Sequence, residues 1–282
     1  MKTEFPFQEV LESLLNAIPS EYQEGEKQQT IKWILESVFG VTSAQLLTRS
    51  PLSIDPEKLK EVTTRLANHE PVQYIMGEVN FYGCQLKVAS GVLIPRPETE
   101  ELAYRIVQEN KTENIEVIWD LCSGSGCLAI SLAKELKAKT FGVDIHPKAI
   151  ELGSENAKLN YADTDFFRVD LLNEKLPELP PPQIIVSNPP YVTENEKQLM
   201  RPNVLHHEPH IALFVSEGSP LIFYDRIFQI AQEKLMEGGK IYLEINEQFG
   251  RETQALAFKY GFSTAEIWQD WSGKDRFVKA VK

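Results

Sequence analysis

The chain has 282 residues, with 29 Lys and Arg against 41 Asp and Glu, which gives a formal net charge of -12. The acidic excess is present both before and after Arg96, so no basic arm or basic half is available to neutralise nucleic-acid phosphates. No apolar run approaches the roughly 18 to 20 residues that span a bilayer, and the chain starts without an apolar signal region. We therefore expect a cytoplasmic protein with no membrane partner and no direct nucleic-acid partner.

The first part of the chain has the periodicity of helices. Apolar residues recur at helical spacing in two segments, 7–15 and 31–39. An Asp-Pro pair at 55–56 is typical of a helix start, with Asp as the N-cap. Aromatic and β-branched residues interrupted by glycines then follow. We predict a helical domain over residues 1–72 and a β-hairpin connector over residues 73–95.

Predicted strands and helices alternate over residues 96–282. The expected strands are 115–121, 140–145, 166–169, 183–188, 240–246, 262–268 and 275–281. The expected helices are 98–110, 127–136, 147–159, 219–236 and 248–259. Apolar strands separated by amphipathic helices indicate an α/β fold in which a mostly parallel seven-stranded sheet is covered on both faces. Ligands of such sheets bind at the carboxyl ends of the strands, near the point where the strand order reverses.

A glycine-containing loop at residues 120–126, here called the glycine loop, follows the first of these strands and leads directly into a helix. Small residues there let the backbone turn sharply and let a ligand approach the N–H groups of a helix N-terminus. Asp144 ends the next strand, where a carboxylate can accept both hydroxyls of a ribose. A dinucleotide cofactor, a purely structural turn, and an N-cap role for Asp144 are alternatives that this loop alone leaves open. The candidate cofactor-binding residues are Asp120, Cys122, Ser123, Gly124, Ser125, Gly126 and Asp144.

A second candidate site is the Asn-Pro-Pro-Tyr segment, Asn188, Pro189, Pro190 and Tyr191, which follows a buried strand. Prolines have no N–H and a fixed φ, so carbonyl groups of this turn are left free at the strand end. The Asn188 side-chain carbonyl and the Pro189 backbone carbonyl can hold the two hydrogens of an amide or amino nitrogen and aim it at an electrophile. We expect Tyr191 to pack over the planar substrate group. The alternative is a strand exit that is merely stiffened by proline.

With these two loops in this order, the chain resembles the class I S-adenosylmethionine-dependent methyltransferases, and more narrowly the PrmC/HemK family. That family methylates the glutamine side-chain amide nitrogen (N5) of peptide chain release factors. The resemblance covers nearly the whole chain. The segments that carry it are Glu70–Gly77, Leu93–Glu100, the glycine loop, Ser187–Val192, and Glu208-Pro209 with Ala212-Leu213.

The resemblance implies a role for each matching residue. Cys122 to Gly126 and Asp144 are expected to bind the methionine and ribose parts of S-adenosyl-L-methionine, and Asp170 and Leu171 to flank its adenine. Asn188 to Tyr191 are expected to hold the glutamine of a Gly-Gly-Gln motif, with Asn188 also touching the cofactor. Arg96 and Glu98, with Glu101, are expected to close the site around the substrate. The helical domain is expected to recognise the release factor, and the enzyme to act as a monomer without a metal.

At position 122 this chain has Cys where the family usually has Gly. We expect the Cys122 side chain to be tolerated if its φ is negative. Three cysteines, Cys84, Cys122 and Cys127, are too few for a disulfide framework, and we expect free thiols. The histidines of the segment 206–210 match no strong zinc pattern, so we expect a structural or substrate-side loop.

Two competing functions are compatible with the glycine loop and the Asn-Pro-Pro-Tyr segment. An N-methyltransferase acting on adenine or guanine of nucleic acid shares Asn-Pro-Pro-Tyr, but it predicts a positive groove that this acidic chain lacks. A non-catalytic factor that only binds the cofactor or a partner would not need the intact Asn-Pro-Pro-Tyr segment. The sequence therefore favours protein methylation.

Overall fold

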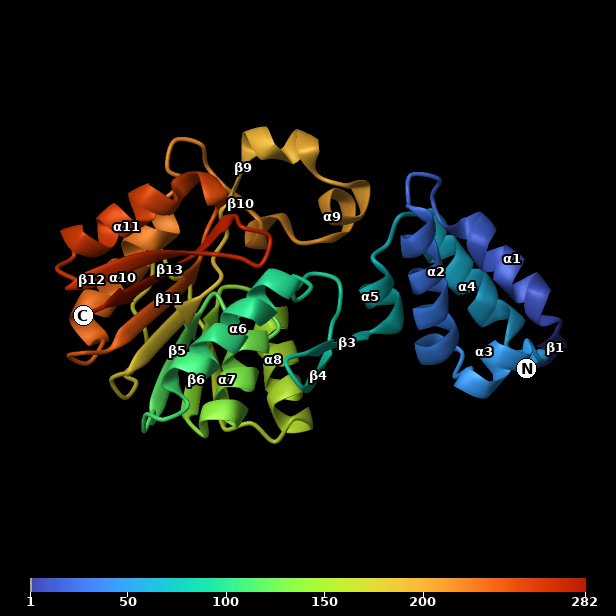
Figure 1. Ribbon diagram of the computed structural model, residues 1–282, viewed down its shortest axis with the longest axis horizontal. Coiled ribbons are helices and arrows are strands. Elements are labelled where there is room, and N and C mark those ends of the chain that lie inside the picture. The colour runs from blue at the N-terminus through green and yellow to red at the C-terminus, as the bar shows by residue number, and fades with distance from the viewer. Residues whose placement is uncertain (1) are drawn as a thin grey trace. The chain divides into compact units, whose positions relative to one another are not determined.

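The computed structural model describes residues 2–282, and the chain forms two compact units (Figure 1). The first, here called the helical unit, contains the residues up to Glu78 together with Arg201–His207. The second, here called the sheet unit, contains Val79–Met200 and Glu208–Lys282. No helix among residues 2–282 is long and apolar enough to cross a bilayer.

The helical unit is built from short amphipathic helices around its own apolar core. Asp55 caps the N-terminus of α4 by accepting a hydrogen bond from the Glu57 N–H, and Pro56 is the first helical residue, as predicted. Val10, Leu14 and Ile34 are fully buried in the core. The helices are α1 (Phe7–Ala17), α2 (Glu24–Trp33), η1 (Ile34–Val38), α3 (Ser43–Thr48), α4 (Pro56–Ala67), α5 (Val72–Met76) and α9 (Pro202–His207). The strands β1 (Thr3–Phe5) and β2 (Leu52–Ile54) pair antiparallel.

The sheet unit contains the seven-stranded sheet, in the order β12-β13-β11-β8-β5-β6-β7. Only β13 runs antiparallel to its neighbours, so the predicted mostly parallel sheet is confirmed. The strands are β5 (Val117–Leu121), β6 (Lys139–Asp144), β7 (Thr164–Arg168), β8 (Ile184–Ser187), β11 (Lys240–Glu244), β12 (Thr264–Gln269) and β13 (Asp275–Val281).

Five main helices accompany the sheet: α6 (Pro97–Asn110), α7 (Cys127–Leu136), α8 (Pro147–Leu159), α10 (Ile222–Lys234) and α11 (Gly250–Lys259). A hairpin of β3 (Glu78–Phe81) and β4 (Cys84–Lys87) precedes them, within the range predicted as a connector. That range begins, however, inside α5, so it also holds most of a short helix. The remaining short elements are β9 (Val192–Thr193), η2 (Glu194–Leu199), η3 (His210–Ala212), β10 (Phe214–Val215) and η4 (Glu247–Phe249).

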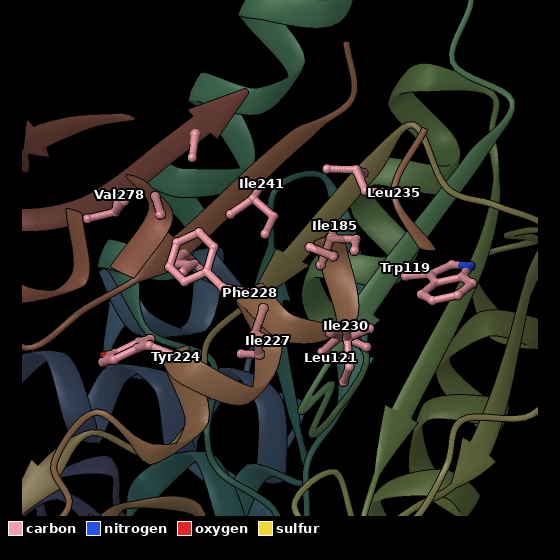
Figure 2. Packing of buried hydrophobic residues seen from close by; sticks show 14 of the residues in the cluster. Trp119, Leu121, Ile185, Tyr224, Ile227, Phe228, Ile230, Leu235, Ile241 and Val278 are labelled. Carbon is pink, nitrogen blue, oxygen red and sulfur yellow. The ribbon is translucent and has the colours of Figure 1, made fainter. Parts of the chain in front are cut away.

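Successive residues of the central strands pack on opposite faces of the sheet, as the period of a strand requires. Ile184 and Val186 of β8 belong to the cluster that contains residues of α6 and α7. Ile185, between them, belongs to the cluster that contains Phe228 of α10 (Figure 2). Both faces of the sheet are therefore covered, and its open positions are at the strand ends.

Candidate active site

The two candidate loops leave the sheet from adjacent positions. The chain runs from β5 to β6 and β7 on one side, and then returns to place β8 on the other side of β5. Leu121 of β5 pairs in register with Ser187 of β8, and the Ser187 hydroxyl donates to the Leu121 carbonyl. The glycine loop and the Asn-Pro-Pro-Tyr segment thus begin side by side at the point where the strand order reverses.

A pocket of about 250 Å³ lies at this edge of the sheet unit. The predicted residues that line it are Arg96, Asp120, Cys122, Ser123, Gly124, Ser125, Asp144, Asp170, Leu171, Asn188 and Pro190. Five predicted residues, Glu98, Glu101, Gly126, Pro189 and Tyr191, are not part of its lining. Lining residues that the sequence interpretation had not named as site residues include Thr99, His146 and Phe223.

The glycine loop is held by hydrogen bonds within the sheet edge. The Ser123 N–H donates to the Val143 carbonyl at 2.9 Å, and the Gly126 N–H donates to the Ser123 carbonyl at 2.8 Å. Gly126 has a φ of +80°, and a Cβ there would lie 2.6 Å from Phe166. Glycine at 126 is therefore required by the turn and by the packing of Phe166, rather than by direct approach of a ligand.

We expected the Cys122 side chain to be tolerated at a negative φ. Cys122 instead has a φ of +64°, so this expectation is not met. In this left-handed region the Cβ of a non-glycine residue is crowded by backbone atoms. The next residue, Ser123, is hydrogen-bonded to Val143 of the neighbouring strand β6. Burial raises the pKa of the Cys122 thiol well above its usual range. All three cysteines are free thiols, as predicted.

Asp120 is a buried carboxylate with one unused oxygen. Its Oδ2 accepts the Ala129 N–H at 3.0 Å, whereas Oδ1 is buried without a hydrogen-bond partner. Burial raises the pKa of Asp120 to about 8. The Ser123 hydroxyl is also buried without a partner. Because buried polar groups in proteins are nearly always satisfied, two orphaned polar groups in the lining of one pocket indicate a polar ligand.

Asp144 is positioned by backbone donors at the end of β6. Its Oδ2 accepts the Gly124 N–H and its Oδ1 accepts the His146 N–H, each at 2.9 Å. Each oxygen keeps a further lone pair, so the carboxylate can still accept two hydroxyls. The N-cap of α8 is His146, whose side chain accepts the Lys148 N–H. Asp144 is therefore not the helix cap that the sequence left open.

Asp170 and Leu171 line the pocket after β7. The Asp170 carboxylate is largely used locally, because it accepts the N–H groups of Leu172 and Asn173 and the Asn173 side-chain amide. The hydrogen bond from Asn173 is the main reason why the pKa of Asp170 is lowered. Leu171 is buried and supplies an apolar surface at this end of the pocket.

Asn188 lies in the pocket wall, and its side-chain amide is fixed by a contact that the sequence did not reveal. Its Nδ2 donates to Thr99 Oγ1 at 2.9 Å. The Tyr191 hydroxyl donates to Glu244 at 2.8 Å, and the ring packs against the hydrophobic core instead of lining the pocket. Burial raises the pKa of Tyr191 well above its usual range, so it is a neutral donor.

Of Arg96, Glu98 and Glu101, which were expected to close the site around the substrate, Arg96 is the one that lines the pocket. Glu208 is 4% exposed and accepts both the Arg96 guanidinium at 2.5 Å and the Ile94 N–H at 3.2 Å. This pairing ties the segment 91–96, which lines the pocket, to the chain that follows Asn-Pro-Pro-Tyr. Glu101 is turned elsewhere, since it accepts hydrogen bonds from Arg105 and from the Trp271 N–H.

The histidines of the segment 206–210 have separate environments. His207 contacts the Asn68 carbonyl at 2.7 Å through Nε2, and His210 packs edge-on against Phe214. Over the described range 2–282, no group of three or more His, Cys, Asp or Glu is arranged to hold a metal ion.

The strand order, the loops and the pocket together define a class I methyltransferase fold. A methyltransferase from Pyrococcus furiosus is similar, with a TM-score of 0.51, 15% identity, and coverage of 71% of this chain and 89% of that one. The T. thermophilus 16S rRNA N2 G1207 methyltransferase, solved with AdoMet and guanosine, gives a TM-score of 0.53 and 17% identity over 73% of this chain and 49% of that one. At these identities, the similarity concerns the fold alone.

Sequence relatives identify the family. Two family models match, the methyltransferase small domain at residues 101–210 and the PrmC N-terminal domain at residues 9–77. The release factor glutamine methyltransferase of Flavobacterium psychrophilum is 39% identical over 94% of this chain and 95% of that protein. The protein of the same name from Bacteroides thetaiotaomicron is 42% identical over 79% of this chain and 80% of that protein. The chain belongs to the release factor glutamine methyltransferase family, and the resemblance to PrmC/HemK is confirmed.

Proposed function

We propose that this enzyme transfers a methyl group from S-adenosyl-L-methionine to the side-chain amide nitrogen (N5) of the glutamine in the Gly-Gly-Gln motif of peptide chain release factors. The observation that carries the proposal is the position of Asn188, which lines the same pocket as the glycine loop with its Nδ2 donating to Thr99. Its Oδ1 is thereby available as an acceptor for an amide hydrogen. The family membership supports the same activity.

The pocket suits a cofactor that carries an ammonium group and a ribose. Asp120 Oδ1 and the Ser123 hydroxyl, both orphaned, would hold polar groups of its methionine part. The remaining lone pairs of Asp144 would accept the ribose hydroxyls, and Leu171 would contact the adenine. The bound cofactor would supply an electrophilic methyl group on a sulfonium and leave as S-adenosyl-L-homocysteine, and the methylated nitrogen would then lose one proton to solvent.

The contribution of the chain to transfer is to hold the acceptor nitrogen in line with that methyl group. An amide nitrogen is a poor nucleophile because its lone pair is delocalised into the carbonyl. Asn188 Oδ1 and the Pro189 carbonyl would each accept one of its hydrogens, which fixes its orientation and favours the positive charge that develops on it. Arg96 and Glu208 would hold the segment 91–96 over the reacting groups and exclude water.

A methyl-transfer assay tests the function. Enzyme, radiolabelled S-adenosyl-L-methionine and a release factor are expected to give labelled factor, and the same factor with its motif Gln replaced by Asn is expected to stay unlabelled. Asn188→Ala is expected to lower turnover at least about a hundredfold with cofactor affinity retained, since one oriented acceptor is lost. Label on adenine or guanine of added nucleic acid, with none on the factor, would overturn the proposal in favour of a nucleic-acid methyltransferase.

We also propose that the helical unit recognises the release factor. Its match to the PrmC N-terminal domain model supports a role specific to this family. Adding intact factor is expected to slow hydrogen exchange in part of the range 2–78, whereas a short Gly-Gly-Gln peptide leaves that range unchanged. Protection confined to the sheet unit in both cases would contradict this role.

A further inference from the structure

Four polar side chains of the sheet unit form one connected hydrogen-bond network beside the pocket. Thr99, near the start of α6, donates to Glu244 Oε2 at 2.6 Å. Tyr191 donates to the other oxygen, Oε1, at 2.8 Å. Asn188 donates through Nδ2 to Thr99 Oγ1 at 2.9 Å. Thr99 and Asn188 line the pocket, whereas Glu244 does not.

When Glu244 is ionised, the hydrogen-bond network has one consistent direction. Glu244 is 1% exposed, and each of its two oxygens is the acceptor of a hydroxyl group. Burial raises the pKa of Glu244, and the hydrogen bonds from Thr99 and Tyr191 oppose that rise. Because a threonine hydroxyl has a single proton and Glu244 receives it, Thr99 Oγ1 can only accept from its other partner. That partner must be the NH₂ group of Asn188.

The orientation of the Asn188 amide therefore depends on a residue that lies outside the pocket. With Nδ2 directed at Thr99, Oδ1 occupies the opposite side of the amide. In the reversed orientation the NH₂ group would face the NH₂ group of the substrate amide, donor against donor, and no hydrogen bond would form.

We infer that Glu244 and Thr99 are positioning residues that fix the side-chain amide of Asn188 with Oδ1 presented to the substrate. The inference rests on the proposed function, since it concerns how the glutamine amide is recognised. Glu244 acts through Thr99, which transmits the direction of the hydrogen bond to Asn188.

Paired substitutions at Thr99 test the inference. Thr99→Val keeps the shape but removes the hydroxyl, so kcat with release factor is expected to fall about tenfold or more, as the loss of one oriented hydrogen bond implies. The dissociation constant of S-adenosyl-L-methionine is expected to change less than about threefold, since Asn188 orientation concerns the substrate side. Thr99→Ser keeps the hydroxyl and is expected to rescue most of the turnover.

Two further variants complete the series. In Glu244→Gln the new NH₂ group can donate to Thr99, which then gives its own proton to Asn188 and reverses the amide, so kcat is expected to fall as in Thr99→Val. Thr253→Val is the matched control, because Thr253 is a fully buried threonine of α11 whose hydroxyl has no partner. It is expected to leave kcat unchanged. Unfolding midpoints, measured for every variant, show that each assay is made on folded protein.

A release factor with its motif Gln replaced by Glu gives a readout that general loosening would not produce. In the wild type, Asn188 presents its Oδ1 to the carboxylate of this Glu, and the two oxygens repel each other. In Thr99→Val the side-chain amide of Asn188 can turn, so that its NH₂ group donates to the carboxylate. The variant is therefore expected to be inhibited more strongly by the Glu factor than the wild type is, although its KM for the Gln factor rises.

The outcomes separate this inference from the function on which it rests. Unchanged turnover in Thr99→Val, equal losses in the Ser and Val variants, or weaker inhibition by the Glu factor would overturn the inference while wild-type turnover upholds the function. No transfer by the wild type to any release factor would overturn both.

Discussion

Cys122 has a side chain that is poorly suited to its backbone conformation. Its φ of +64° lies where glycine is favoured, and a non-glycine residue there costs about 1–2 kcal/mol. The side chain is partly buried and packs against the hydrophobic core of the sheet unit.

The strain at Cys122 predicts an order of stabilities. Cys122→Ala removes the sulfur but keeps the strained Cβ, whereas Cys122→Gly removes both. We expect the Gly variant to be more stable than the Ala variant by about 1 kcal/mol, measured from denaturant unfolding midpoints. An Ala variant as stable as the Gly variant would show that the loop adapts to a side chain without strain.

Asp120 predicts a pH dependence of stability in the cofactor-free enzyme. Its pKa is about 8 in the folded protein against an ordinary value of 3.8. Because the raised value favours the protonated form, its stabilising effect is complete below about pH 4 and is lost as the pH rises toward about 8. Wild type is therefore expected to lose stability relative to Asp120→Asn across this range, by at most about 1.4 kcal/mol per pH unit.

Asp165→Asn serves as the control for this experiment, because the Asp165 side chain is 57% exposed and forms an ion pair with Lys139. Its stability is expected to follow the wild-type pH dependence. Parallel curves for wild type and Asp120→Asn would contradict the assignment of the proton to Asp120.

At the scale of elements, the buried carboxylate of Glu208 accepts hydrogen bonds from Ile94 and Arg96 of the segment 91–96, which lines the pocket. Glu208→Gln keeps one acceptor oxygen and loses the charge that pairs with Arg96. We expect amide exchange in the segment 91–96 to accelerate about tenfold, with a higher KM for the cofactor, because an anchored hydrogen bond to a charged group is weakened. Glu217→Gln, at an exposed position, is the control and should leave this exchange unchanged. Equal exchange in both variants would show that Glu208 does not hold the segment.

The elements that the sequence predicted well are those with a local signal. The strands and helices after Arg96 follow from apolar periodicity, and both loops were placed at the correct edge of the sheet because parallel strands end together. The contact between Thr99 and Glu244 joins residues 145 positions apart, so no local sequence pattern predicts it. The positive φ of Cys122 has no signal in the local sequence either, because the residue at that position is not glycine.

At the scale of the whole molecule, the formal charge of -12 predicts how the rate of association with the substrate depends on salt. If the release factor presents a basic surface, long-range attraction accelerates the encounter and salt screens it. We expect the association rate constant to fall as KCl is raised, while the dissociation rate constant changes little. Sucrose at matched viscosity is the control, and an association rate that does not depend on salt would contradict electrostatic steering.

The residues Arg201–His207 belong to the helical unit although they lie in sequence after the Asn-Pro-Pro-Tyr segment. In that unit Arg201 pairs with Glu26 at 2.7 Å, and His207 contacts the Asn68 carbonyl. The chain therefore passes from one unit to the other three times. The helical unit therefore cannot be removed by deleting the N-terminal residues alone. A protein shortened to begin at Val79 would leave Arg201 and His207 without these partners. Recombination that exchanges only the N-terminal part of the gene would have to bring a matching 201–207 segment with it.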